Sequence, residues 1–284
     1  MDQVNEIKMK AYITLLRPLN CVMTSIAVLT AGLIAIGRDI QGSLFIELGA
    51  MICAFIFAGA GNALNDYYDA ETDRINHPER PIPSGRIQRS GARVFAIILF
   101  VVSNLLAGFI SWYLKDILPV LILMAATVLM VSYEIRFKAR GFVGNAVISV
   151  LIALGFIFGG TIVQRVEMVI LPATLALLSN LGREILKDIE DIKGDVDRRT
   201  LPMKIGIYKA TLVSSGFFAS AIILSPLPYA LGILSGIYLV IVGIADIIFI
   251  YTIVTSFGSP SNAQRASKLG MVVALVAFVA GGVL

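Results

Sequence analysis

The chain has few of the residues that hold disulfides or transition metals. Its 284 residues include two cysteines and one histidine. Cys21 and Cys53 lie inside apolar runs, where a thiol most often packs as a small hydrophobic group, so we expect neither a disulfide nor a cysteine metal site. His77 lies in a polar segment and is given no ligand role. Zinc, copper and iron–sulfur centres are therefore poor candidates, since they depend on thiolate and imidazole ligands.

Charge is scarce as well. Only 15% of the residues are charged, 57% are hydrophobic and the mean hydropathy is +0.87. This composition excludes a soluble globular protein and predicts an all-α, multi-pass membrane bundle of nine transmembrane helices, because nine apolar runs can cross a hydrocarbon core about 30 Å thick. These runs lie near residues 12–37, 44–65, 92–114, 117–133, 142–163, 168–186, 209–226, 228–254 and 266–284.

The positive charges are distributed unevenly between the two ends of these spans. All but three of the 23 lysines and arginines fall in the N-terminal segment or in the loops after the second, fourth, sixth and eighth spans. The exceptions are Arg38, Lys115 and Arg165. Because cytoplasmic loops are enriched in lysine and arginine, we expect the N-terminus and these loops in the cytoplasm and the C-terminus outside the cell membrane. Membrane topology explains this distribution better than nucleic-acid binding does.

Two segments repeat one acidic pattern, D-x-x-D-x-x-x-D. Residues 62–73 read NALNDYYDAETD and residues 184–195 read EILKDIEDIKGD. On a helix the three aspartates of each pattern fall within an arc of about 60°, so each segment presents three carboxylates on one face. These candidate catalytic and metal-binding residues are Asp66, Asp69, Asp73, Asp188, Asp191 and Asp195.

The two acidic segments are 122 residues apart in the sequence. The same offset aligns the first four spans with the next four in the same direction, which predicts a parallel four-plus-four internal repeat. The half-repeats extend over about 12–133 and 134–255, the ninth helix at 266–284 follows them, and residues 1–284 form a single domain. Since repeats of this kind often place a site at their interface, we expect both acidic segments to face one cavity at the cytoplasmic surface.

Aspartates gathered at one end of a helical bundle repel one another and require a positive partner. Their hard oxygen ligands suit Mg²⁺, which is commonly held by a few carboxylates and completes its shell with water and phosphate oxygens. Combined with nearby cations, such a site suits a diphosphate, and in a membrane the natural diphosphate is a polyprenyl one. The candidate substrate-binding residues are Arg17, Asn20, Asn62, Arg80, Arg86, Tyr133, Lys138, Arg140, Asn145, Arg183, Lys187 and Lys204.

The acidic segments form two aspartate-rich signatures, NDYYDAETD at 65–73 and DIKGD at 191–195. Four other features accompany them, namely Arg17-Pro18, RPIPSG at 80–85, Tyr133 with Lys138, and TLP at 200–202. Together these motifs resemble the UbiA superfamily of intramembrane prenyltransferases over most of the chain. The resemblance implies transfer of a prenyl group, with Mg²⁺ on the six aspartates and the loops at 74–90 and 196–208 as lids that exclude water.

The acceptor is inferred from resemblance within the superfamily. Residues 183–195 and 76–86 look most like the archaeal members that add a geranylgeranyl chain to the free hydroxyl of geranylgeranylglyceryl phosphate, an ether-lipid precursor. An acceptor with its own phosphate would explain the surplus cations, and the candidates to meet this phosphate are Arg136, Lys138, Arg140 or Lys204. Without a histidine as general base, an aspartate oxygen or the departing diphosphate is expected to take the hydroxyl proton.

Other readings of the sequence stay open. An aromatic acceptor, as for the side chain of a quinone, chlorophyll or haem, is the alternative to a lipid phosphate. A cation-coupled transporter is an alternative of a different class, because transporters also combine repeats with intramembrane acids. The expected partners are a prenyl diphosphate, a lipid-phosphate acceptor and membrane lipids; no nucleic acid and no obligate protein partner is expected.

Overall fold

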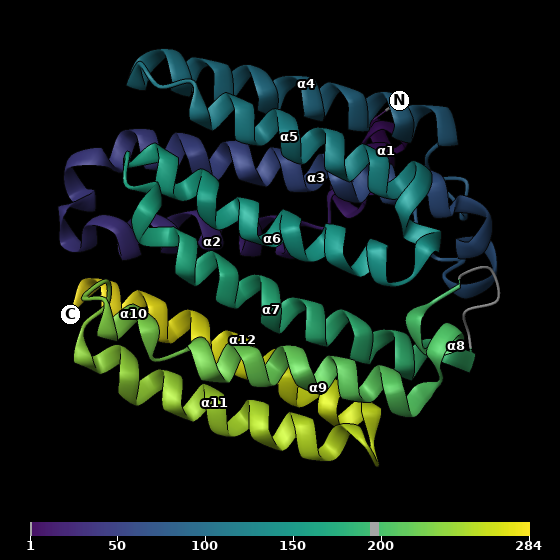
Figure 1. Cartoon of the computed structure of the whole chain (residues 1–284). Coiled ribbons are helices and arrows are strands. Elements are labelled where there is room, and N and C mark those ends of the chain that lie inside the picture. Colours follow the sequence, from purple (N-terminus) through teal and green to yellow (C-terminus); the bar gives the residue numbers. More distant parts are fainter. Residues whose placement is uncertain (1, 194–198) are drawn as a thin grey trace. The chain divides into compact units, whose positions relative to one another are not determined.

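The structure is a computed structural model that describes residues 2–193 and 199–284 (Figure 1). Within these ranges the chain forms helices and turns without any strand, which confirms the predicted all-α fold. The longer helices are α1 (Asp2–Leu16), α2 (Pro18–Ile36), α3 (Leu44–Asn76), α4 (Arg89–Leu114), α5 (Leu118–Ser132), α6 (Phe142–Ile162), α7 (Val166–Glu190), α9 (Ile207–Leu224), α11 (Gly236–Ser256) and α12 (Pro260–Val283). The shorter ones are η1 (Gly37–Ser43), η2 (Tyr133–Phe137), η3 (Lys138–Arg140), η4 (Asp191–Lys193), α8 (Leu201–Ile205) and α10 (Leu227–Ala230).

Eight continuous helical segments of the described chain are long and apolar enough to cross a membrane. The first of them, Pro18–Asn76, contains both α2 and α3, joined by the 3₁₀ segment η1. Counting α2 and α3 separately gives nine spans over the described residues, in agreement with the predicted nine. The protein is therefore a multi-pass membrane protein.

The first predicted span, 12–37, is wrong at its beginning. Arg17 has a positive φ of 51° and separates α1 from α2, so that α2 begins at Pro18. Proline is well suited to this position, because a first-turn residue needs no backbone N–H. The hydropathy of the sequence did not reveal α1, since this helix carries charged residues along with apolar ones.

The ends of three other spans also differ from the prediction. Helix α3 extends through the whole first acidic segment to Asn76, beyond the predicted end at 65. Helix α12 begins at Pro260, because helical backbone continues through polar residues that end the apolar run. Helix α11 begins at Gly236 and not at 228, since Pro228 and Gly232 lie in a separate turn that contains α10. The apolar runs thus locate the membrane spans, but α3 and α12 extend beyond them into polar sequence.

The chain divides into two compact units, and each is described by itself. The first contains the residues up to Leu29 together with Leu44–Ile135, and the second contains Thr30–Ser43 and Arg136–Leu284. The boundary after Ile135 lies close to the predicted boundary between half-repeats, but Thr30–Ser43 belongs to the second unit. The internal repeat therefore stays a prediction.

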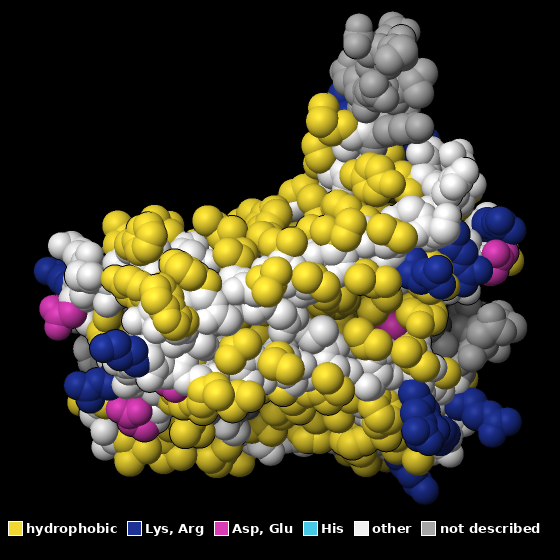
Figure 2. Space-filling model, turned by 90° about the horizontal axis from the view of Figure 1, so that it is seen from above, with side chains coloured by type: hydrophobic (Ala, Val, Ile, Leu, Met, Phe, Trp, Pro, Cys, Tyr) yellow, Lys and Arg dark blue, Asp and Glu magenta, His cyan; other side chains and the backbone are white. Residues whose placement is uncertain are grey.

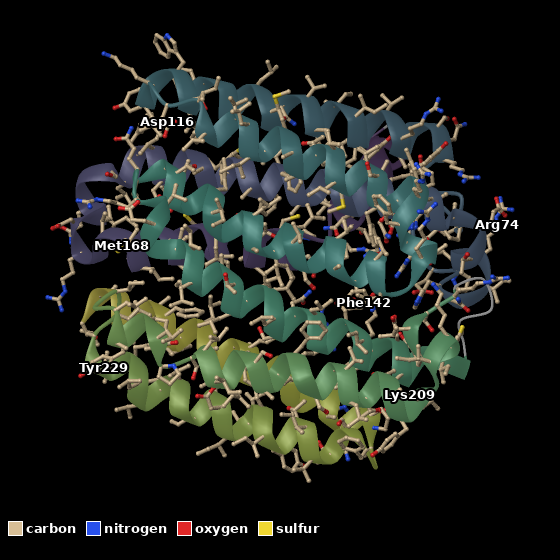
Figure 3. All side chains as sticks on the ribbon, in the orientation of Figure 1. Arg74, Asp116, Phe142, Met168, Lys209 and Tyr229 are labelled. Atoms are coloured by element: carbon tan, nitrogen blue, oxygen red, sulfur yellow. The ribbon has the colours of Figure 1, made fainter. Side chains whose placement is uncertain are left out.

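The first unit packs α1 and α4 against α3, and α5 against both α3 and α4. Its core is rich in alanine, with Ala60 and Ala63 on α3 facing Ala92 and Ala96 on α4. Small side chains let helices approach closely in a membrane protein. Arg74 at the end of α3 and Asp116 after α4 lie at opposite ends of this unit (Figure 3), so the acidic segment of α3 lies at the Arg74 end.

The second unit is organised around α7, which contacts α6, α9 and α12. Gly182 of α7 permits close approach to α9, since a Cβ there would lie 2.9 Å from Cε2 of Phe218. Figure 3 places Phe142 and Lys209 at one end of this unit and Met168 and Tyr229 at the other, as expected for helices of alternating direction. The acidic segment follows the end of α7 that lies near the start of α6.

Large hydrophobic side chains are exposed along most of the long helices. Figure 2 shows them covering most of the visible surface, with lysine and arginine confined to restricted areas. A soluble protein rarely exposes apolar patches of this extent, whereas helices that contact lipid do so along their length.

Candidate functional site

The first acidic cluster lies on α3 in the first unit. Asp66 and Asp73 are buried, with relative exposures of 3% and 4%, and Asp69 between them is half-buried. The guanidinium of Arg17 donates a hydrogen bond to Asp66 Oδ1. Arg80 Nη1 donates to both oxygens of Asp73, at 2.7 and 2.6 Å, and lies 3.8 Å from Asp66 Oδ1. Buried carboxylates require such partners, because an unpaired buried charge is costly.

Arg17 reaches Asp66 because the chain breaks between α1 and α2. The positive φ of Arg17 costs about 1–2 kcal/mol relative to ordinary helical backbone. Asn62, one helical turn before Asp66, donates from Nδ2 to the carbonyl of Leu16 at 2.7 Å. This bond satisfies a carbonyl at the end of α1 and holds the break in place. Strained backbone supported in this way is frequent at functional sites.

Arg80 is positioned by the loop between α3 and α4. Ile82 and Ile87 of this loop pack into the core of the first unit, and the Ser84 hydroxyl donates to the Arg80 carbonyl at 2.7 Å. Gly85 has a φ of +73°, which allows the turn to close. The first predicted lid, 74–90, therefore has three parts. Residues 74–76 end α3, residues 77–88 form a loop anchored by apolar side chains, and residues 89–90 begin α4.

A further acid lies beside this cluster and was not among the predicted site residues. Glu134 is buried on the π-helical turn η2, and Asn65 donates from Nδ2 to Glu134 Oε1 at 2.9 Å. Single π-helical turns are frequent at functional sites. No sequence signal identified Glu134, because an acid among cations in a short turn has the pattern of a solvated loop.

The second acidic cluster lies at the end of α7 in the second unit. Asn145, in the first turn of α6, donates from Nδ2 to Asp188 Oδ2 at 2.8 Å. Asp191 is exposed at the start of η4, and Asp195 lies outside the described residues. In each unit, the first aspartate of the motif thus binds a residue near the beginning of another helix, Arg17 for Asp66 and Asn145 for Asp188.

The last turns of α7 also carry a network of polar side chains. Arg183 donates to Glu184 and to Asn180 Oδ1, and Lys187 Nζ lies 3.9 Å from Glu184 Oε2. Asn180 is fully buried and donates to the Ser149 hydroxyl at 3.0 Å. Neither Asn180 nor Glu184 was a predicted site residue. The sequence did contain a signal for Glu184. It lies four residues before Asp188, just as Asn62 lies four residues before Asp66.

The remaining predicted residues are placed less specifically. Asn20, Arg140 and Lys204 are exposed. Arg86 is exposed as well, and its bonds to Ser84 and to the Glu79 carbonyl lie within its own loop. Tyr133 and Lys138 are half-buried, at the start of η2 and of η3. The structure thus brings Arg17, Asn62 and Arg80 to the first cluster and Asn145 to the second, whereas Arg183 and Lys187 contact Glu184, about one turn before Asp188.

The donor set of both clusters fits a hard divalent cation. The aspartates offer only oxygen ligands, and within residues 2–193 and 199–284 no three His, Cys, Asp or Glu side chains converge on one point. A metal would therefore need further ligands. Mg²⁺ usually obtains them from water and from substrate phosphate, and it binds few protein carboxylates. The first cluster already binds cationic groups, since Arg17 and Arg80 contact Asp66 and Asp73.

Comparison with known sequences decides the family. The model of the UbiA prenyltransferase family matches residues 25–279. The chain belongs to the UbiA prenyltransferase family. Its relatives include digeranylgeranylglyceryl phosphate synthase of Methanosphaera stadtmanae, 41% identical over 96% of this chain and 99% of the relative. The enzyme of the same name from Methanothermobacter thermautotrophicus is 39% identical over 96% of each chain.

Solved structures of UbiA proteins agree with this assignment. A structure reported for digeranylgeranylglyceryl phosphate synthase in membranes is 33% identical, with a TM-score of 0.85 over 97% of this chain and 99% of the other. A UbiA homologue from Archaeoglobus fulgidus bound to DMAPP and Mg²⁺ is 18% identical and has a TM-score of 0.68 over 94% and 98% of the two chains. The first confirms the helical membrane fold of this UbiA protein, and the second supports the fold alone.

Proposed function

We propose that this UbiA protein transfers a geranylgeranyl group from geranylgeranyl diphosphate to the free hydroxyl of geranylgeranylglyceryl phosphate. The observation that carries the proposal is the similarity to digeranylgeranylglyceryl phosphate synthases, which extends over 96% of this chain at 39–41% identity. The product is the two-chain phosphate named by those relatives. One catalytic domain, built from two half-repeats, performs the reaction.

In this proposal both acidic motifs hold Mg²⁺ for one diphosphate. The metal ligands are Asp66, Asp69, Asp73, Asp188, Asp191 and Asp195. When bound, Mg²⁺ neutralises negative charge that develops on the departing pyrophosphate. The proposal is supported by the oxygen-only side chains of these six aspartates, which suit Mg²⁺, and by the Mg²⁺ bound to the Archaeoglobus fulgidus homologue.

The chain's own cations bind and orient the diphosphate. Arg17 and Arg80 contact the aspartates of the first cluster and retain N–H donors for phosphate oxygens, since each guanidinium carries five. Arg183 and Lys187 are held by Glu184. Such groups stabilise pyrophosphate as it leaves and are more effective when they are fixed before the reaction begins.

The bond between the allylic carbon and the diphosphate oxygen breaks first, leaving an allylic carbocation and pyrophosphate. The acceptor hydroxyl oxygen then forms the ether bond, and its proton goes to an aspartate carboxylate or to pyrophosphate. Water would capture the same cation, so the site must exclude it. The loop between α3 and α4 is suited to this task because Ile82 and Ile87 anchor it.

The membrane orientation follows from the charge distribution together with the order of spans. Helices α3 and α7 are separated by three spans, so both cross the membrane in the same direction. The ends that carry the acidic motifs face the cytoplasm, and the N-terminus lies on the same side, since most lysines and arginines lie there.

A choice between acceptors tests the proposed function. Purified protein is incubated with Mg²⁺ and geranylgeranyl diphosphate, with geranylgeranylglyceryl phosphate in one sample and 4-hydroxybenzoate in another. We expect the two-chain ether phosphate in the first sample and no prenylated phenol in the second, as measured by mass spectrometry. Prenylation of the phenol alone would assign the chain to the aromatic branch. Metal-dependent flux across liposomes without any prenyl product would assign it to transport.

A further inference from the structure

Two arginines outside the acidic clusters are gathered on one aromatic ring. Arg89 and Arg93, four residues apart at the start of α4, place their guanidinium carbons 4.9 and 5.9 Å from the centre of the Tyr67 ring. Arg89 Nε also donates to the carbonyl of Tyr67 at 3.0 Å. Tyr67 directly follows Asp66 on α3, so the ring that both arginines contact belongs to the first acidic segment.

The local charge of this Arg89–Tyr67–Arg93 cluster is incompletely balanced. Glu71 lies 3.8 Å from Arg89, but its other oxygen accepts a 2.8 Å bond from Arg74. Arg93 is exposed, and none of the described carboxylates pairs with it. Like charges four residues apart on a helix repel each other, and an anion between them removes that repulsion. Arginine is the side chain best suited to phosphate, because its planar N–H groups bind two oxygens at once.

Exposed apolar side chains follow the two arginines along α4 and form a stripe that winds around the helix. At the four-residue spacing of Arg89 and Arg93 follow Ile97, Val101 and Leu105, with relative exposures of 53%, 53% and 69%. Each step of four residues turns by about 40°, so successive members of the stripe are neighbours, and Ile97 and Val101 lie nearest to the face of the arginines. Two cations at the end of the span and hydrocarbon along its length match a lipid with a phosphate headgroup.

We propose that the Arg89–Tyr67–Arg93 cluster and the α4 stripe dock a membrane lipid that carries a phosphomonoester, with the phosphate between the arginines and the hydrocarbon chain on the stripe. The charge of the headgroup favours a phosphomonoester, which carries about −1.5 to −2 at neutral pH and matches two guanidiniums, whereas a phosphodiester carries only −1. On the proposed function, the acceptor geranylgeranylglyceryl phosphate is such a lipid. The cluster then determines specificity for the acceptor.

The test compares R89Q/R93Q with the wild type and with R265Q, whose exposed arginine lies on α12 of the second unit. Rates are measured in phospholipid-free detergent at varied acceptor and at varied geranylgeranyl diphosphate. Losing two charge-assisted contacts to phosphate should raise KM for the acceptor at least about tenfold. The kcat at saturating acceptor and KM for the diphosphate should change less than about twofold. R265Q should behave as the wild type; an acceptor KM unchanged in R89Q/R93Q would overturn the proposal.

Further arms separate the other outcomes. If phosphatidylglycerol alters the activity of the wild type and the double variant loses only that response, the surface binds bulk lipid and the proposal is wrong. If the double variant does not fold, R93Q alone should raise the acceptor KM about threefold.

If the wild type does not turn over this acceptor, the proposed function fails and docking is tested by native mass spectrometry. The wild type should then bind geranylgeranylglyceryl phosphate more strongly than the same lipid without its phosphate, and R89Q/R93Q should bind the two lipids equally. Equal binding of the two lipids by the wild type would overturn the docking proposal.

Discussion

Asp69→Ala is expected to lower the rate of prenyl transfer about a thousandfold. Asp69 lies between two buried carboxylates that arginines already hold, and it is half-buried itself. In our account its carboxylate binds Mg²⁺, whose interaction with developing charge is worth several kcal/mol, and each 1.4 kcal/mol corresponds to a factor of ten. Asp191→Ala should have an effect of the same order. Rates are measured as radiolabelled ether lipid formed by purified protein.

Glu71→Ala is the matched control for Asp69→Ala. Glu71 lies two residues further along α3, is 64% exposed at its side chain and pairs with Arg74 at the surface. Exposed pairs of this kind contribute little to stability, so this variant should fold and retain most of its kcat. Circular dichroism and gel filtration establish that all variants are folded. Full activity in both aspartate variants would remove the metal-site hypothesis.

Removal of divalent metal should stop the reaction as completely as either aspartate substitution. Purified protein is treated with EDTA, passed over a desalting column and assayed with both substrates. Activity should fall below detection, because the uncompensated charge of pyrophosphate makes it a poor leaving group. Adding Mg²⁺ should restore it, and Ca²⁺ should restore much less, since Ca²⁺ prefers larger shells of six to eight ligands. Turnover that persists after chelation would contradict this part of the account.

The membrane fold could be predicted from sequence because it depends on composition over long windows. Nine apolar runs and the one-sided charge distribution need no knowledge of tertiary contacts. Pro18 indicates a helix start, but the preceding helix α1 and the positive φ of Arg17 could not be predicted in this way, because they depend on contacts from elsewhere in the chain. One such contact comes from Asn62, 46 residues along the chain, which bonds to the Leu16 carbonyl.

The candidate site was predicted unevenly for a similar reason. The aspartates repeat at helical spacing, so their common face follows from periodicity alone. Their partners are distant in sequence: Arg17 is 49 residues from Asp66, and Asn145 is 43 residues from Asp188. Glu134 was missed because its burial results from packing of η2 near Asn65. A single sequence contains no record of such a contact.

Binding of an unreactive diphosphate tests the central claim most directly, namely that both acidic motifs and a divalent cation serve one prenyl diphosphate. Geranylgeranyl thiolodiphosphate, whose sulfur replaces the bridging oxygen, is titrated by calorimetry into wild type, Asp69→Asn and Asp191→Asn, with Mg²⁺ and after chelation. The account predicts one equivalent bound by wild type with Mg²⁺, little without it, and at least about tenfold weaker binding in either variant. Metal-independent binding of wild-type strength in both variants would contradict it.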